Sequence, residues 1–171
     1  NVLDGPMSIT SDGSGNVFVT GYVSSTNFPV QNAGPGTFYQ GTYGAGSGNA
    51  NAFILKFNNA GVRQWATYYG GNGNTDPQYI TTDGSGNVFV TGKVTSTTFP
   101  TFNPGGGAYF QGVSPSGGNG DAFILKFDNL GNRKWATYYK ASAAYSIITD
   151  GTGNVYVTGS ASPTNFLTKT P

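Results

Sequence analysis

Cysteine, histidine and glutamate are absent from this chain of 171 residues. Without cysteine and histidine, the chain lacks the usual ligands of zinc and iron sites. The same absence removes thiol chemistry and the histidine base of a catalytic triad. Acid–base chemistry would fall on the seven aspartates, or on lysine and tyrosine. We therefore expect no enzyme, no catalytic residues, no metal site and no cofactor.

Charge is also scarce, because charged residues make up 9% of the sequence and the net charge is +1. Such a weak and scattered charge cannot steer the chain onto nucleic acid or an anionic membrane. No apolar run reaches the roughly 18 residues of a membrane-spanning helix. We expect neither nucleic-acid binding nor membrane insertion. Position 1 is asparagine, so we expect a processed product or a segment of a longer protein.

Glycine and aromatic residues are abundant, with 28 glycines and 15% aromatic side chains. A disordered chain would combine few aromatic residues with high charge, so this chain is expected to fold. Glycine, asparagine and threonine at this level, without many helix-favouring charged residues, are typical of strands joined by tight turns.

The strongest signal is an internal repeat. Residues 8–29 and 79–100 are identical at 17 of 22 positions, and residues 146–166 repeat the pattern again. A second block alternates with the first, because residues 52–69 and 122–139 agree at 14 of 18 positions. We therefore divide the chain into two full repeats and a partial third that contains only the first hairpin. The three repeats cover residues 1–71, 72–139 and 140–171.

Each full repeat contains four candidate strands, separated by turns rich in Asp, Asn and Gly. In the first repeat they are expected at Met7–Ser11, Val17–Val23, Phe53–Phe57 and Gln64–Tyr69. The second and third strands are apolar at successive positions, which indicates burial on both faces. Four-stranded sheets stacked face to face around an axis provide such burial, so the sequence predicts an all-β β-propeller with about two and a half blades. The later strands are expected at Gln78–Thr82, Val88–Val94, Phe123–Phe127, Lys134–Tyr139, Tyr145–Thr149 and Val155–Ser160.

The turn DGSGN or DGTGN follows the first strand of each repeat. It faintly resembles a calcium loop, but glycine occupies two of its five positions, and a calcium loop needs several oxygen ligands at alternating positions. A hairpin turn capped by the aspartate is the favoured interpretation, with positive φ angles expected at Gly13 and Gly84. The residues assigned to these structural turns are Asp12, Gly13, Gly15, Asp83, Gly84, Gly86, Asp150, Gly151 and Gly153.

The successive motifs DAFILKF, WATYYGG, ITTDGSGNVFVTG and TSTTFP closely resemble bacterial seven-bladed β-propeller repeats of the SBBP type. The resemblance covers nearly the whole chain. It implies a propeller fold and an exported or cell-surface setting in bacteria. It implies no single activity, because the family is defined by its scaffold.

The predicted ring is incomplete, since roughly 70 residues per blade leave fewer than the 4–8 blades typical of propellers. The last repeat stops after its second strand, near Phe166. An open array would expose apolar faces and sheet edges, which promote association. The rest of the propeller is therefore expected from a longer parent chain, or from other copies that complete the ring.

Lys56 and Lys126 recur inside strongly apolar strands. A buried lysine needs a charge partner or a route to water. A structural role is therefore favoured, either as a pair with a nearby aspartate or at the blade edge. The alternative is a cation that lines a ligand site.

Aromatic and basic residues recur around the fourth strand. Trp65 and Trp135 are expected to pack between blades, rather than to act as platforms for sugars. Arg63 and Arg133, at the turn just before them, are expected to lie in solvent.

Two long glycine-rich loops, Val30–Asn51 and Thr101–Gly120, differ most between the copies. Loops on a rigid scaffold commonly carry binding residues. Their aromatic and amide side chains offer stacking faces and neutral hydrogen bonds, which suit glycans. The alternative is that these side chains pin each loop onto its own blade. The candidate ligand-binding residues are Phe38, Tyr39, Gln40, Tyr109, Phe110 and Gln111.

Three functions are compatible with these features. The favoured one is a non-enzymatic, secreted or cell-surface scaffold for adhesion or protein–protein interaction, with surface proteins or glycans as partners. The second is a glycan-binding propeller that uses the loops. The third is a hydrolase with paired carboxylates. Asp4, Asp76 and Asp121 lie near loop ends, but nothing in the sequence pairs them.

Overall fold

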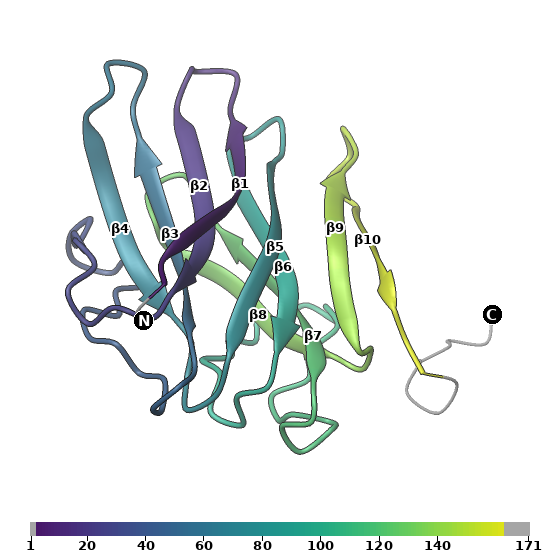
Figure 1. The fold of residues 1–171 in the computed structure, drawn as a ribbon. Coiled ribbons are helices and arrows are strands. Elements are labelled where there is room, and N and C mark those ends of the chain that lie inside the picture. Colours follow the sequence, from purple (N-terminus) through teal and green to yellow (C-terminus); the bar gives the residue numbers. More distant parts are fainter. Residues whose placement is uncertain (1–2, 163–171) are drawn as a thin grey trace.

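The computed structural model describes residues 3–162, which form ten strands and no helix (Figure 1). No helix that could span a membrane is found among these residues. The predicted stop near Phe166 lies outside them. The strands are β1 (Gly5–Ser11), β2 (Val17–Val23), β3 (Asn51–Phe57), β4 (Arg63–Tyr69), β5 (Thr75–Thr82), β6 (Val88–Val94), β7 (Asp121–Phe127), β8 (Arg133–Tyr139), β9 (Ala143–Thr149) and β10 (Val155–Ser160).

Each sheet is an antiparallel meander whose strands follow one another in sequence order. Strands β1–β4 form the first blade and β5–β8 the second, while β9 and β10 form a two-stranded third sheet. The three sheets stand side by side, and their first strands β1, β5 and β9 are neighbours (Figure 1). This arrangement confirms the predicted all-β class of partial propeller blades.

The two complete blades share one strand register. Val17 is opposite Phe57 in the first blade, and Val88 is opposite Phe127 in the second. Directly opposite residues in a sheet project to the same face and contact each other. Residues at equivalent repeat positions therefore contact equivalent cross-strand neighbours in the two blades.

The largest core lies between the first and second blades. Phe18, Ile54 and Trp65 of the first blade pack against Val90 and Phe127 of the second, and all five side chains are buried. The rings of Trp65 and Phe127 have centroids 6.1 Å apart. Trp65 thus packs between blades, as predicted.

The second blade is covered on both faces. Val90 faces the first blade, while Phe89 packs with Ile147 of β9 on the other side. This burial explains why β6 is apolar at successive positions. The far face of the third sheet is open, because Ile148 and Tyr156 are 55% and 53% exposed.

The turn after each first strand is closed by its aspartate. The Asp12 carboxylate accepts hydrogen bonds from the backbone N–H groups of Ser14 and Asn16, at 2.9 and 3.0 Å, and from the side-chain amide of Asn16 at 2.7 Å. The same set of bonds recurs at Asp83 and Asp150. Side-chain oxygens that cap nearby N–H groups stabilise such turns.

The expectation of positive φ at Gly13 and Gly84 was wrong. The positive φ angles belong to Gly15, Gly86 and Gly153, at 77°, 76° and 92°. In the first turn, Gly15 N donates a hydrogen bond to Asp12 O, and Gly13 and Ser14 lie between them. The left-handed conformation is then adopted by Gly15, at the end of this turn. Strain on substitution is therefore expected at the later glycine.

The first strand of each sheet begins two or three residues earlier than predicted, at Gly5, Thr75 and Ala143. The third strands begin two residues early and the fourth strands one. Pro6 and Pro77 concealed the extension of the first strands, because proline usually interrupts strand pairing. Both prolines lie beside a β-bulge, which tolerates proline.

A β-bulge interrupts β1, β5 and β9 at the same repeat position. The bulged residues, which have no partner on the neighbouring strand, are Met7, Gln78 and Tyr145. A glycine lies beside each bulge on the partner strand, at Gly21, Gly92 and Gly159. A Cβ atom on any of these glycines would lie 2.1 Å from a backbone carbonyl oxygen. The close approach of the two strands therefore requires glycine.

Candidate binding surfaces

Lys56 links the first blade to the second. Its Nζ donates hydrogen bonds to the backbone oxygen and to Oδ1 of Asn129, at 3.1 and 2.9 Å, and lies 5.6 Å from the centre of the Phe18 ring. Burial lowers the pKa of Lys56, and the carboxylates of Asp12 and Asp128 oppose this shift. The predicted structural role holds, but the hydrogen-bond partner is an asparagine on the next blade rather than an aspartate.

Lys56→Met is expected to destabilise the chain by about 1–3 kcal/mol, because it removes both hydrogen bonds from Nζ and leaves Asn129 Oδ1 without this donor. Lys126→Met is the matched control. Lys126 has the same repeat position and lies over the Phe89 ring, and its Nζ donates no hydrogen bond within residues 3–162. Urea unfolding of both variants measures the difference. Equal losses would show that the bonds to Asn129 contribute nothing specific.

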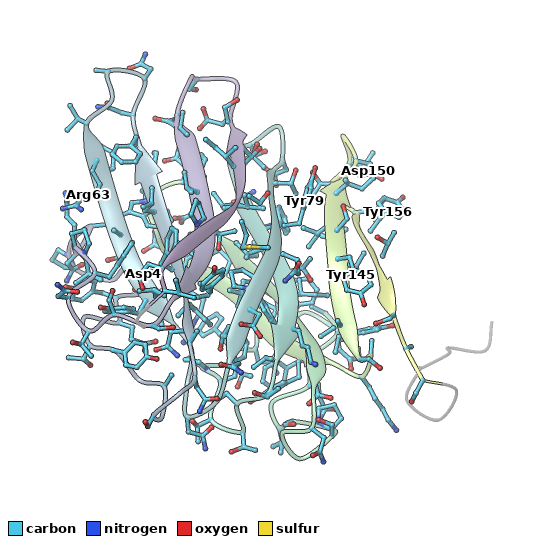
Figure 2. The ribbon with its side chains drawn as sticks, in the orientation of Figure 1. Asp4, Arg63, Tyr79, Tyr145, Asp150 and Tyr156 are labelled. Carbon is cyan, nitrogen blue, oxygen red and sulfur yellow. The ribbon has the colours of Figure 1, made fainter. Side chains whose placement is uncertain are left out.

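Arg63 and Arg133, the first residues of the fourth strands, contact the long loops, contrary to the expectation that they lie in solvent. The Arg133 guanidinium lies 4.6 Å from the centre of the Phe38 ring and 5.1 Å from that of Phe102. Arg63 Nε donates to Gln31 Oε1 at 2.8 Å. A planar guanidinium can stack on aromatic rings while it donates hydrogen bonds, so each arginine joins a loop to the end of a blade. Arg63 is labelled in Figure 2.

The candidate residues of the first long loop have different surroundings. The Phe38 ring lies 4.8 Å from that of Tyr69 and 6.1 Å from that of Phe127, between the two blades. The backbone of Gln40 hydrogen bonds to β4. Tyr39, between them, is 38% exposed. Packing therefore accounts for Phe38 and Gln40 without a ligand.

The second long loop is placed in the same way. Tyr109 lies 5.2 Å from Tyr139, and its backbone oxygen accepts a hydrogen bond from Trp135 Nε1 at 2.9 Å. The backbone of Gln111 bonds to β8, and Phe110 is half-buried. These contacts favour the alternative that the side chains pin the loops. The assignment of the six residues to ligand binding stays a prediction.

Six of the seven aspartates accept hydrogen bonds from neighbouring residues. Their carboxylates accept hydrogen bonds from nearby backbone or side-chain groups. These six are Asp4, Asp12, Asp83, Asp121, Asp128 and Asp150. Their oxygens serve to close turns and loops, which leaves them little capacity for acid–base chemistry.

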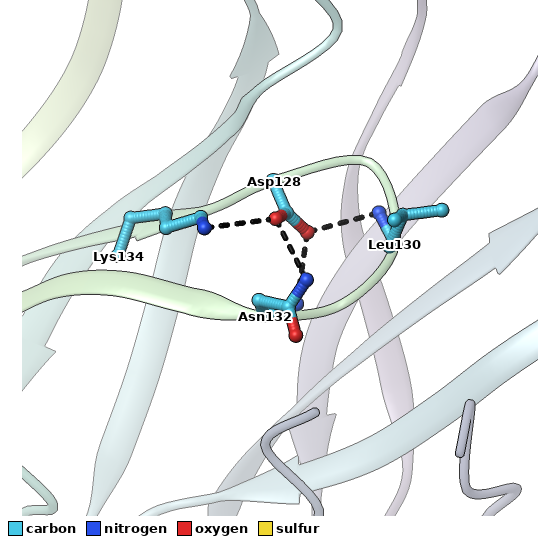
Figure 3. Close-up of polar contacts among 4 residues, drawn as sticks. All are labelled: Asp128, Leu130, Asn132 and Lys134. Atoms are coloured by element: carbon cyan, nitrogen blue, oxygen red, sulfur yellow. Dashed lines mark hydrogen bonds and ion pairs between the residues drawn. The ribbon is translucent and has the colours of Figure 1, made fainter. Parts of the chain in front are cut away.

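Asp128 illustrates this use of a carboxylate (Figure 3). It accepts hydrogen bonds from the backbone of Leu130 and from the backbone and side chain of Asn132, and it pairs with Lys134 Nζ at 3.1 Å. Burial alone would raise the pKa of Asp128, but the hydrogen bonds from Asn132 and the contact with Lys134 lower it below the usual 3.8. The folded state therefore favours the charged form.

Asp128→Asn is expected to lower stability at pH 7 by about 1 kcal/mol, because charge-assisted bonds become neutral ones. The pKa is depressed in the folded state, so the stabilisation is present above pH 3.8 and is lost as the pH falls through the folded pKa. Urea unfolding at pH 7 and at pH 3 should therefore show the two proteins converge in acid. A difference that is unchanged in acid would contradict this assignment.

Asp76 is the exception among the aspartates. It lies on β5 opposite Lys93 on β6, and no hydrogen bond to its carboxylate is found among residues 3–162. Burial raises the pKa of Asp76, while the charge of Lys93 opposes the rise. A half-buried carboxylate without a hydrogen-bond donor is a candidate for contact with a ligand.

A pocket of about 440 Å³ surrounds this carboxylate, where β1, β5 and β9 adjoin. Its lining includes Met7, Tyr22, Asp76, Gln78, Lys93 and Tyr145. Sequence reasoning noted Asp76 but missed the other five. A signal was available, since the repeats disagree at these positions although a glycine recurs at Gly21, Gly92 and Gly159 on the partner strand.

A second pocket, of about 310 Å³, lies between the second blade and β10. Tyr109, Trp135 and Tyr139 line its wall on the second blade. On the first blade, the corresponding aromatic side chains surround Phe127 of the next blade. This pocket therefore occupies the place that the third strand of a blade fills elsewhere in the fold.

Comparison with known proteins identifies the repeat. Residues 64–100, from β4 through β5 and β6, match the SBBP family, described as a beta-propeller repeat. This segment is similar to a beta-propeller repeat. The match confirms the resemblance drawn from the motifs, and the matched segment spans the junction between the first two blades.

A more distant relative is an uncharacterised WD repeat-containing protein of Acanthamoeba polyphaga mimivirus. It is 25% identical to this chain over 165 residues, which are 92% of this chain and 12% of the relative. The chain thus spans about an eighth of that relative's length. Both similarities are to proteins built from repeats.

Proposed function

We propose that this chain is a non-enzymatic propeller segment of a secreted or cell-surface bacterial protein, which acts in adhesion or protein–protein interaction. The observation that carries this proposal is that the side chains at repeated positions stabilise the scaffold. Lys56 and Trp65 join one blade to the next, and the turn aspartates close hairpins. The scaffold is thereby built from the repeated positions, and the variable loops and strand ends are left for contact.

The setting and the partners have separate support. The cell-surface location rests on the resemblance of the motifs to repeats of exported bacterial proteins. Similarity to a WD repeat-containing protein agrees with a scaffold role. The pocket beside β10 has room for a large side chain in the place that Phe127 fills beside the first blade, which supports completion by further repeats of a parent chain or by other copies.

The two alternative functions have less support. A glycan-binding role for the loops rests on Tyr39 and Tyr109, each 38% exposed, since their neighbours are used in packing. A hydrolase of the common type needs two carboxyl groups that flank the scissile bond. Asp76 is the one carboxylate among the described residues that line its pocket.

Surface display on a non-adhesive bacterium tests the proposal. Cells that display the chain are expected to attach to protein-coated surfaces above the level of cells with an empty display vector. A displayed Phe127→Ala variant, in which the core between the blades is disrupted, should lose the effect. Attachment equal to the empty vector on every protein coating would contradict the proposal. Attachment to glycan coatings alone would favour the loop-based lectin instead.

A further inference from the structure

The three bulged residues of the first strands meet in one pocket. The register of each first strand shifts at the same repeat position, which leaves Met7, Gln78 and Tyr145 unpaired. All three side chains line the pocket of about 440 Å³ between β1, β5 and β9. Bulges commonly redirect a side chain towards a functional site, and here three sheets direct one residue each to the same place.

The scaffold around this pocket is constant, whereas its lining varies. The glycine beside each bulge occurs in all three repeats. By contrast, the bulged positions carry methionine, glutamine and tyrosine. The pair that includes Asp76 and Lys93 corresponds to Gly5 and Tyr22 in the first blade. A structural role shared by the blades would favour the same residue in each repeat, so these differences indicate a role specific to the assembled pocket.

The polar groups of the pocket are available to a ligand. The Asp76 carboxylate and the Lys93 ammonium are opposite one another, more than the 4 Å of an ion pair apart, and neither has a hydrogen-bond partner among residues 3–162. Gln78 adds an amide that can donate and accept. Tyr145, on β9, is 55% exposed and offers an aromatic face (Figure 2).

We infer that this pocket binds a neutral, polyhydroxylated ligand, namely a saccharide. Asp76 accepts hydrogen bonds from sugar hydroxyls, Lys93 donates to them, and Tyr145 stacks on the apolar face of the ring. The two charges offset each other, so a ligand with a net charge gains no electrostatic preference over a neutral one. A volume of about 440 Å³ lies within the roughly 300–1,000 Å³ of small-molecule sites. This site is separate from the long loops and goes beyond the proposed scaffold role.

Saturation-transfer NMR on the 171-residue chain tests the site. The probes are methyl α-mannoside, methyl β-galactoside and N-acetylglucosamine, each in millimolar excess. At least one sugar is expected to receive saturation from the protein. Asp76→Asn should weaken its binding about tenfold, because a charge-assisted hydrogen bond becomes neutral. Tyr145→Ala should weaken it at least as much, because the stacking face is lost.

Tyr156→Ala is the matched control, since Tyr156 lies on the neighbouring strand β10, is 53% exposed and does not line this pocket. It should bind sugar as the unchanged chain does, and circular dichroism should show all three variants folded. The inference is overturned if none of the three sugars receives saturation, or if folded Tyr145→Ala binds with unchanged affinity. Stronger binding of lysine methyl ester than of any sugar would also overturn it. The saturation-transfer measurements do not depend on the cell-attachment assay. The binding of sugar and the proposed scaffold function can therefore be contradicted independently.

Discussion

Replacing Phe127 with alanine is expected to lower the free energy of unfolding by about 3–5 kcal/mol, the usual cost of removing a fully buried phenylalanine. Phe127 is 0% exposed. Its ring lies 6.1 Å from Trp65, 5.9 Å from Tyr69 and 6.1 Å from Phe38, so the truncation leaves a cavity among three aromatic side chains of the neighbouring blade. Urea unfolding monitored by tryptophan fluorescence measures the loss.

Phe57→Ala provides the comparison within the same molecule. Phe57 ends the same FILKF motif in the first blade, but it is half-buried, because its face of the sheet has no neighbouring blade among residues 3–162. Its loss should cost clearly less than the loss of Phe127. Similar costs for the two variants would show that contact between blades is not what buries this position.

Gly92→Ala is expected to cost about 3 kcal/mol, at the upper end of the range for overpacking. The new Cβ would lie 2.1 Å from the Asp76 carbonyl oxygen and 2.8 Å from Pro77 Cα. Both are backbone atoms, so β5 and β6 would have to separate at the bulge. The same variant should reduce sugar binding, since Gln78 and Asp76 would move with the strand.

Gly84→Ala is the control for the loss of a glycine in the same blade. A Cβ at Gly84 meets no atom within 4 Å, and its φ is not positive. The change is therefore expected to remain within about 0.5 kcal/mol. Thermal and urea unfolding of both variants measure the difference in their stability. A Gly92→Ala protein as stable as the Gly84→Ala protein would show that the bulge is not a fixed feature.

The blades could be predicted from sequence because their determinants are local and recur. The motif AFILKF gives apolar side chains on both faces, and the DGSGN turn marks a hairpin, so strand order followed from the repeat itself. The packing of Trp65 between blades could be predicted for the same reason. Burial on both faces requires neighbouring sheets.

Other features depended on contacts between distant segments. The partner of Lys56 is 73 residues away, on the next blade, and no pattern near Lys56 points to Asn129. The positive φ could not be assigned between Gly13 and Gly15, because either glycine can adopt it. Pro77 suggested the end of a strand, since the bulge that accommodates it is visible only in the register of β5 with β6.

The bulge of the first strands places residues in the pocket whose side chains do not take part in strand pairing. Met7, Gln78 and Tyr145 have no partner across the strand, so their identities bear little on pairing. A combinatorial library randomised at these three codons alone would change the lining of the proposed sugar pocket while the pairing of the strands stayed intact. The propeller could in this way be retargeted to new small molecules by directed evolution, without redesign of its core.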